Sequence, residues 1–232
     1  MKVSVVVPAF NEERLLAGSL AAIRQAMAAF PQSELIVCDN NSTDRTAEIA
    51  RAAGAIVVFE PVNQIARARN AGAARASGDW LVFVDADSYP DKALFAETAQ
   101  AMQSGRVVGG GATVEVEASE PIARVWLALW NSLSRAMKWA AGSFVFCEAA
   151  AFRRLGGFSE ALYAGEEIDF SRRLKQLGRL VILHRHPLLT SDRKMRLYST
   201  GEHLAFMLKT LLLGGRNLRN RDSCHVWYDG RR

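Results

Sequence analysis

Two acidic residues stand two positions apart, directly after an apolar run of the chain. The acids are Asp85 and Asp87, with Ala86 between them, and the apolar run covers residues 80–84. Carboxylate oxygens suit Mg²⁺ and Mn²⁺, and such an ion can join two acids to a phosphate group. The spacing therefore indicates a site for a divalent cation and a diphosphate, where the cation stabilises a departing anion.

The same stretch is open to other interpretations. Asp, Ser and Pro are common in turns, so residues 85–91 would also serve as a plain loop. An EF-hand is excluded, because the sixth position of such a loop is Pro90 rather than Gly and the twelfth is Ala96 rather than Glu. A phosphatase of the haloacid dehalogenase type also carries two aspartates after a strand, although usually after the first strand. This phosphatase remains an alternative.

Polar residues also follow the other strands that the sequence predicts. Asn11 and Glu12 come after the first, and Asp39 comes after the second. Ligands of open α/β sheets bind at the carboxyl ends of the strands, where Glu12 suits a ribose or base and Asp39 suits an N–H of a base. Asn11 is also a plausible helix cap. The turn at 8–13 contains no glycine, which excludes a dinucleotide-binding GxGxxG loop and a Walker A loop.

Two basic stretches add candidates for phosphate binding. Arg67 and Arg69 are two residues apart on an expected helix, so only one can point toward the strand ends, and we favour Arg69. A polar, basic loop at 191–196 contains Arg193 and Lys194. We expect this loop to be a lid whose cations neutralise a diphosphate when the donor binds.

The elements that must position these residues alternate between strands and helices. Apolar strands are expected at 3–7, 35–38, 56–59 and 80–84, with helices at 12–29, 43–53 and 64–76 between them. This alternation predicts an α/β fold with a mostly parallel central sheet and helices on both faces. The second half is less regular. Its expected elements are a long edge or bent strand at 107–116, helices at 121–140, 166–177 and 202–213, and strands at 143–147 and 180–184.

Length and charge suggest one domain with a basic end. A chain of 232 residues suits a single α/β domain, which we place at 1–215 and divide into halves at 1–105 and 106–215. The net charge is +5, and arginines crowd residues 216–232, which we expect to be a basic C-terminal tail. Such a bias suits a diphosphate, an anionic lipid surface or nucleic acid, and an ordinary solvated tail explains it equally well.

The cysteines and the apolar stretches indicate in which cellular compartment the protein acts. Cys38, Cys147 and Cys224 have no CxxC spacing and look like reduced thiols, which favours the cytoplasm. The apolar run before Pro8 is too short for a signal sequence or a membrane span. Tryptophans in 121–140 and the apolar helix at 204–213 suit either a peripheral contact with the inner face of the membrane or packing in the core or a homodimer.

In their order along the chain, these pieces resemble glycosyltransferase family 2, whose catalytic domain has the GT-A fold. The resemblance covers roughly residues 1–178 and rests on five segments: 5–12 (VVVPAFNE), 37–44 (VCDNNSTD), 68–72 (ARNAG), 85–87 (DAD), and 156–158 (GGF) continuing to 165–169 (GEEID). The ordered set is far more specific than any one segment.

The resemblance implies a donor, a metal and an inverting reaction. It implies a sugar linked to UDP or GDP, a hydroxyl acceptor for which a lipid-linked form is one option, and Mn²⁺ or Mg²⁺, but no nucleic acid partner. It also implies that residues 1–105 form the nucleotide-sugar-binding half and residues 106–215 the acceptor-binding half. Acceptors that it suggests belong to cell-envelope polysaccharide, glycolipid or polyprenyl-phosphate glycosylation. Donor contacts are implied at six positions: Pro8, Ala9, Glu12, Asp39, Asp85 and Ala86. Asp87 is implied as the direct metal ligand, with Asp85 beside the ribose and the metal.

The general base is the point at which the chain departs from the family. Family members usually carry Glu-Asp where this chain has Glu166-Glu167, with the second acid as base. We expect Glu167 to take this role, and Asp169 is the alternative. Acids at the start of a helix are also favoured by the helix dipole alone. A module that binds a nucleotide sugar without turnover is a further alternative.

Overall fold

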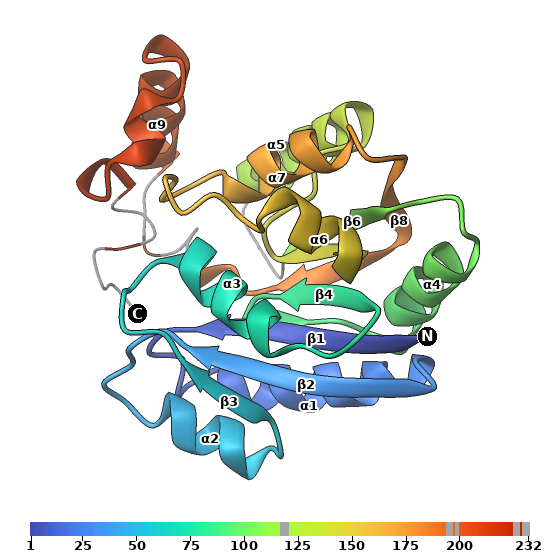
Figure 1. Ribbon diagram of the computed structural model, residues 1–232. Helices are drawn as coiled ribbons and strands as arrows, with labels where there is room; N and C mark the ends of the chain where they lie inside the picture. Colours follow the sequence, from blue (N-terminus) through green and yellow to red (C-terminus); the bar gives the residue numbers. More distant parts are fainter. Residues whose placement is uncertain (117–120, 194–196, 198–199, 225–227, 229–232) are drawn as a thin grey trace.

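Four parallel strands form the first half of the sheet (Figure 1). The computed structural model describes residues 1–116, 121–193, 197, 200–224 and 228. The strands are β1 (Lys2–Ala9), β2 (Gln32–Asp39), β3 (Ile56–Phe59) and β4 (Trp80–Val84). The helices between them are α1 (Leu16–Ala26), the 3-10 turn η1 (Met27–Ala29), α2 (Thr46–Ala52) and α3 (Ile65–Arg75). These elements confirm the predicted alternation.

The second half adds four strands of mixed direction. They are β5 (Ser88–Tyr89), β6 (Gly109–Val116), β7 (Phe144–Glu148) and β8 (Leu180–Thr190). The helices are α4 (Lys92–Gln103), α5 (Pro121–Met137), α6 (Ala149–Leu155), α7 (Glu166–Leu174) and α9 (Thr200–Leu212). The order β3-β2-β1-β4-β7-β6-β8-β5, with β7 antiparallel to both neighbours, gives a mostly parallel mixed sheet.

Each face of the sheet has its own core because side chains alternate along a strand. Val3, Val5 and Val7 of β1 pack on one side with α1 and α4, whereas Val6 packs on the other side with α3, α6 and α7. Helix α3 lies unusually close to β1 at Gly72, where an added Cβ would sit 2.4 Å from Val6 Cγ1. A glycine here therefore sets how closely α3 can approach the sheet.

Several features of the second half differ from expectation. The strand predicted at 107–116 as an edge or bent strand does not lie at the edge, because β6 lies between β7 and β8, but it is irregular between Ala112 and Val114. Strand β8 runs to Thr190 rather than ending at 184, with an irregular stretch at 184–187 opposite β6. Helix α4 was not expected. It begins after Asp91, whose side chain caps it by accepting a hydrogen bond from the Leu94 N–H (2.7 Å).

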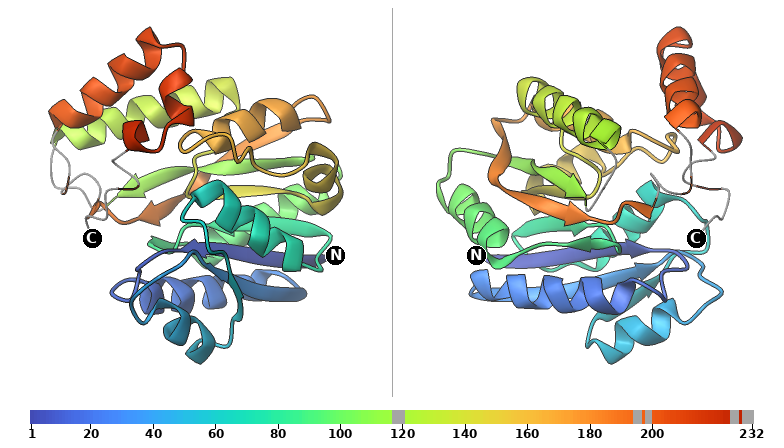
Figure 2. Two further views of the ribbon diagram at one scale, coloured as in Figure 1. Left: turned by 60° about the vertical axis from the view of Figure 1, so that its left-hand side comes forward. Right: turned by 180° about the vertical axis from the view of Figure 1, so that it is seen from behind.

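The helices lie on two sides of the sheet, with α9 at the margin. Figures 1 and 2 show α1 and α2 below the sheet and α3, α6 and α7 above it. The core that contains α1 and α2 also includes α4, and Leu127 and Trp130 of α5 pack against it. None of the described helices is long and apolar enough to cross a membrane.

The segment expected as a basic tail is in part folded. Residues after α9 form two short 3-10 turns, η2 (Arg216–Arg219) and η3 (Asp222–Cys224), in which Asn217 and Cys224 are buried. The Tyr163 N–H donates to the Leu218 carbonyl (2.7 Å), which ties this segment to the loop before α7. The division of the chain into donor and acceptor halves remains a prediction.

Candidate active site

A cavity lies at the carboxyl ends of β1, β2 and β4. It is lined by Pro8, Ala9, Phe10, Glu12, Asn40, Asn63, Ile65, Ala68, Asp85, Ala86, Asp87, Arg193 and Tyr228. Most of the predicted donor and metal contacts are therefore brought to one place, although they come from segments far apart in the sequence. Asp39, Arg69, Glu167 and Asp169 are not among the lining residues.

The loops after β1 and β2 are joined by hydrogen bonds through Asn11 and its neighbours. The Asn11 N–H donates to Ser42 Oγ (2.9 Å), and Asn11 Oδ1 accepts from the Thr43 N–H (2.8 Å). The Glu12 N–H donates to Thr46 Oγ1 (2.8 Å). Asn11 therefore does not cap α1, which begins at Leu16 without a side-chain cap. The expected cap was wrong because the chain turns through a further loop before the helix begins.

Asp39 and Asn40 have local roles at the end of β2. The Asp39 carboxylate accepts from the Ser42 N–H (3.0 Å) and is buried. The Asn40 side chain donates to the Glu60 and Val62 carbonyls (3.1 and 2.6 Å) and accepts from the Gln64 N–H (2.8 Å). Asn40 thus shapes the loop that leads into α3. The predicted contact between Asp39 and a base stays a prediction.

Arg69 is buried among acids rather than solvated. Its Nη1 donates to Glu166 (2.6 Å), and its Nη2 donates to Asp85 (2.9 Å) and to the Gly142 carbonyl (2.8 Å). Burial disfavours the charged guanidinium, but Asp85, Glu166 and Glu167 outweigh it and raise the pKa of Arg69. Arg69 therefore links the first acid of the Asp-Ala-Asp segment to the start of α7.

Glu167 lies beside Arg69, close to Gly142. An added Cβ at Gly142 would be 3.4 Å from Glu167 Oε1 and 3.4 Å from Arg69 Nη2, so this glycine leaves room for both groups. Burial, assisted by the charges of Glu166 and Asp85, raises the pKa of Glu167 from 4.5 to about 8, although Arg69 opposes the shift. A carboxylate with a pKa near neutrality is well suited to general-base catalysis.

Asp169, the alternative base, is paired elsewhere. Its carboxylate accepts a hydrogen bond from Arg173 Nε (2.8 Å), one turn further along α7. Arg173 also donates to the Leu155 and Gly157 carbonyls (3.0 and 2.9 Å). The geometry therefore favours Glu167 over Asp169 as the base, and the assignment remains a prediction.

Arg193 lies across the cavity. Its guanidinium makes two hydrogen bonds to the Glu12 carboxylate (both 2.7 Å) and one to Asp87 (3.2 Å). Burial opposes its charge, but the bonds to Glu12 and the negative charges of Glu12 and Asp87 raise its pKa. The Ser191 N–H donates to the Asp87 carbonyl (3.0 Å), which holds the segment after β8 against the Asp-Ala-Asp segment. Lys194, predicted to share the lid role, lies outside the described residues.

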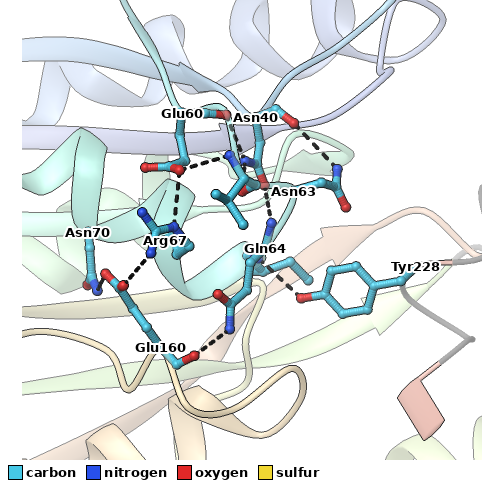
Figure 3. Close-up of polar contacts among 10 residues, drawn as sticks. Asn40, Glu60, Asn63, Gln64, Arg67, Asn70, Glu160 and Tyr228 are labelled. Carbon is cyan, nitrogen blue, oxygen red and sulfur yellow. Dashed lines mark hydrogen bonds and ion pairs between the residues drawn. The ribbon is translucent and has the colours of Figure 1, made fainter. Parts of the chain in front are cut away.

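Hydrogen bonds join two of the segments on which the family resemblance rests, 68–72 and 156–158. Asn70 Nδ2 donates to the Phe158 carbonyl (2.9 Å), and Asn70 Oδ1 accepts from the Phe158 N–H (2.9 Å). Arg67 pairs with Glu60 (3.1 Å) and Glu160 (2.8 Å) on the outer side of α3, as Figure 3 shows. Of the two arginines, only Arg69 therefore points toward the strand ends, where it contacts Asp85, as expected.

Tyr228 was missed in the sequence because no motif surrounds it. Its hydroxyl accepts a hydrogen bond from the Ile65 N–H (3.2 Å) at the start of α3 (Figure 3). Its ring packs edge-on against Tyr163 (centroids 5.6 Å apart), and Arg221 lies over it (5.5 Å). Burial, the main cause, raises the pKa of Tyr228. A residue from the expected tail therefore forms part of the cavity wall.

Asp85 and Asp87 are suitable ligands for a hard divalent cation. Both follow one strand, both line the cavity, and both present carboxylate oxygens. Among the described residues no three His, Cys, Asp or Glu side chains converge on one point, so a cation here would need oxygens from a phosphate or water as well. His184 and His186 lie in the irregular stretch of β8 and are not among the lining residues of the cavity.

Sequence comparison gives a family match and distant relatives. The family model described as Glycosyl transferase family 2 matches residues 4–156. A protein of Mycobacterium tuberculosis (strain ATCC 25618 / H37Rv), named as an uncharacterized glycosyltransferase, is 42% identical over 89 residues, or 38% of each chain. The validoxylamine A glucosyltransferase of Streptomyces hygroscopicus subsp. jinggangensis (strain 5008) is 28% identical over 219 residues, 75% of this chain and 51% of that protein. The chain thus spans about two fifths to one half of these relatives.

Two solved structures share the fold over nearly the whole chain. A mannosyltransferase of Pyrobaculum calidifontis in complex with GDP-Man and Mn²⁺ has a TM-score of 0.70 and 20% identity, covering 96% of this chain and 64% of that chain. S. aureus TarS 1-349 in complex with UDP-GlcNAc has a TM-score of 0.68 and 20% identity, covering 97% of this chain and 69% of that chain. At this identity the likeness concerns the fold alone.

Proposed function

Because the chain belongs to glycosyltransferase family 2, we propose that it transfers a sugar from a nucleotide-diphosphate sugar to an acceptor hydroxyl, with inversion at the sugar carbon. The family and the GT-A fold are those expected from the sequence. The observation that carries the proposal is the link Asp85–Arg69–Glu166, in which one arginine joins the predicted metal ligand Asp85 to the residue next to the predicted base Glu167.

The donor occupies the cavity along the carboxyl ends of β1, β2 and β4. Asp39 and Glu12 contact the nucleoside, and Pro8 and Ala9 form the floor beneath it. Asp85 and Asp87 would hold Mn²⁺ or Mg²⁺, whose charge stabilises the diphosphate as it leaves. Two relatives in fold are described with UDP-GlcNAc and with GDP-Man, which supports a uridine or guanosine donor here without choosing between them.

Glu167 acts as the base. Its carboxylate takes the proton of the acceptor hydroxyl while that oxygen bonds to the anomeric carbon. The bond from that carbon to the diphosphate breaks, and the nucleoside diphosphate leaves with the electron pair. Attack from the face opposite the leaving group gives inversion. Arg69 positions the reaction by fixing Asp85 and Glu166, and its charge keeps part of the Glu167 population ionised.

Arg193, which lies across the cavity, turns from Glu12 and Asp87 to the diphosphate when the donor binds. In the structure its guanidinium occupies the oxygens of Glu12 and Asp87. The donor and the cation require these same acids. Arg193 must therefore break its hydrogen bonds to Glu12 and Asp87 and form new ones to the diphosphate, which is a stronger anionic partner. The acceptor group is a hydroxyl of an envelope polysaccharide or a glycolipid, or a phosphate oxygen of a polyprenyl phosphate, with the lipid-linked forms in keeping with the apolar helices.

A donor panel tests this function. UDP- and GDP-sugars are added to the protein with and without Mn²⁺, and the rise in Tm is measured. We expect one nucleotide series to stabilise the protein, and to do so more strongly with Mn²⁺. That donor is then incubated with wild type and Glu167→Gln, and release of the nucleoside diphosphate is followed.

The outcomes separate the alternatives. Glu167→Gln should bind donor normally and lose turnover by a factor of about 10²–10⁴. Donor binding without turnover in wild type, across all acceptors tried, would favour the binding module. Release of inorganic phosphate from phosphate esters, without nucleotide-sugar binding, would favour the phosphatase.

A further inference from the structure

Helix α5 presents an apolar face to solvent. Its exposed large hydrophobic side chains are Val125, Trp126, Leu129, Leu133 and Met137. With 3.6 residues per turn, these five positions fall within an arc of about 120°. The residues that attach α5 to the body, Leu127, Trp130 and Ser134, lie on the adjoining arc. The exposed arc is therefore additional to the face that the fold already buries.

The remaining surface of α5 is cationic and contains no acid. Arg124 and Arg135 are exposed on the side of the helix away from the apolar arc, and Lys138 follows the helix. No Asp or Glu occurs from Pro121 to Lys138. An apolar arc that contains tryptophan, beside a basic and acid-free flank, is the pattern of a helix that lies in the plane of a membrane surface.

A second apolar and basic patch lies on α9 and the segment that follows it. Leu208 and Leu212 of α9, with Leu213 after it, are exposed, and Arg216 and Arg219 follow at exposed positions. In Figures 1 and 2, α5 and α9 both lie at the top of the molecule, and α1 and α2 lie at the bottom. Both patches combine leucines with cations.

We infer that the α5 face, defined as Val125, Trp126, Leu129, Leu133 and Met137, docks on an anionic membrane surface. The aliphatic side chains enter the boundary of the acyl chains, Trp126 lies at the level of the headgroups, and the arginines extend to the lipid phosphates. A second copy of the chain fits the face less well. Two copies packed across a twofold axis would cover the apolar arc but would leave the cations on the opposite side of α5 unused, whereas an anionic surface uses both.

This inference stands apart from glycosyl transfer, since a membrane contact requires no turnover. The test is flotation of the whole protein with vesicles of phosphatidylcholine and phosphatidylglycerol in equal parts, or of phosphatidylcholine alone, at low and physiological salt. We expect binding to the anionic vesicles and weakening with salt. Trp126 fluorescence should shift to the blue on binding, and this shift should be absent in Trp126→Phe.

A matched pair of variants isolates the face. Leu129 is 57% exposed on α5, and Phe59 is 60% exposed on β3 at the edge of the sheet. Leu129→Glu should weaken vesicle binding about tenfold or more, because it places a charge in the apolar arc. Phe59→Glu, which makes a similar change elsewhere, should bind as wild type does. Arg135→Gln should weaken binding about fivefold.

Three results would overturn the inference. The first is no flotation of wild type with anionic vesicles at any salt concentration. The second is equal binding by Leu129→Glu and wild type. The third is a stable dimer, seen by light scattering, that Leu129→Glu converts to monomer, because the face would then be covered by a second copy.

Discussion

Glu167 lies where a general base is expected, but burial and neighbouring acids disfavour the negative charge of its carboxylate. The side chain stands next to Glu166 and near Asp85, and its pKa is raised to about 8 chiefly by burial. Family members usually carry the shorter aspartate here, and the extra methylene lets this carboxylate reach the space beside Gly142. The type of residue was predictable from the sequence. Its environment was not, because Arg69 and Gly142 come from other segments.

Turnover should rise with pH if Glu167 is the base. The base works only when ionised, so the rate should increase as pH passes through the raised pKa, with an apparent value near 8. The measurement is the initial rate of nucleoside diphosphate release between pH 6 and about 9. Asp169→Asn should keep this profile. Loss of turnover in Asp169→Asn but not in Glu167→Gln would transfer the role to Asp169.

Glu167→Gln should stabilise the fold while it stops transfer. The folded-state pKa of Glu167 is raised above the ordinary 4.5, so the wild type loses stability as pH rises from about 4.5 to about 8. A neutral amide escapes this loss. The Tm advantage of Glu167→Gln should therefore be small near pH 4.5, grow across that window and level off above pH 8. A Tm difference that does not vary with pH would argue against a buried, titrating Glu167.

Arg193→Ala should weaken donor binding about tenfold, through loss of charge-assisted hydrogen bonds to the diphosphate. The measurement is the donor affinity by calorimetry, together with kcat. Arg45→Ala is a suitable control, because Arg45 also pairs with a glutamate, Glu48, but does so at the surface of α2. Unchanged affinity and unchanged kcat in Arg193→Ala would end the lid proposal.

At the scale of elements, the strand–helix alternation of the first half could be predicted from the sequence, because each strand is short, apolar and followed by a polar turn. The bounds of β3 and β4 agree with the prediction. Helix α4 was not expected, because Asp91 was interpreted as part of a loop rather than as its cap. The place of β6 inside the sheet was also not predictable, since its neighbours β7 and β8 follow much later in the chain.

The contact between α3 and β1 gives a test of element packing. Gly72→Ala would place a methyl group 2.4 Å from Val6 Cγ1, so α3 must move, at a cost of about 1–3 kcal/mol. An ordinary helical Gly→Ala change has the opposite sign and gains about 0.5–1 kcal/mol. Gly18→Ala in α1, where the nearest atom is Tyr89 Cε1 at 3.4 Å, is the control. Urea unfolding should show opposite signs for the two variants.

At the scale of the whole molecule, the cavity is assembled from both ends of the chain. The sequence predicted the contributions of the β1 and β4 loops because their motifs are local. Tyr228 contacts Ile65 across 163 positions and depends on the path of the chain after α9, which no local pattern specifies. The basic composition of this segment predicted charge, and the structure adds a buried anchor at Asn217 and Cys224.

Removal of divalent cations should weaken donor binding by the whole protein. Asp85, Asp87 and a diphosphate are all negative, so without a cation their mutual repulsion opposes binding. Chelator-treated protein should bind the donor at least about tenfold less tightly, and Mn²⁺ should restore the affinity. Asp87→Asn should bind weakly with or without Mn²⁺. Equal affinity before and after chelation would remove the metal from the proposed function.

The residues that line the cavity are far apart in the sequence, and this has a consequence during translation. A ribosome that has just passed Asp87 has already made Pro8, Glu12 and Asp85, but Arg193 and Tyr228 have not yet been synthesised. The nascent first half therefore has to fold through its own hydrophobic packing. Ligand can contact Arg193 and Tyr228, and stabilise the fold through them, only after both have been made.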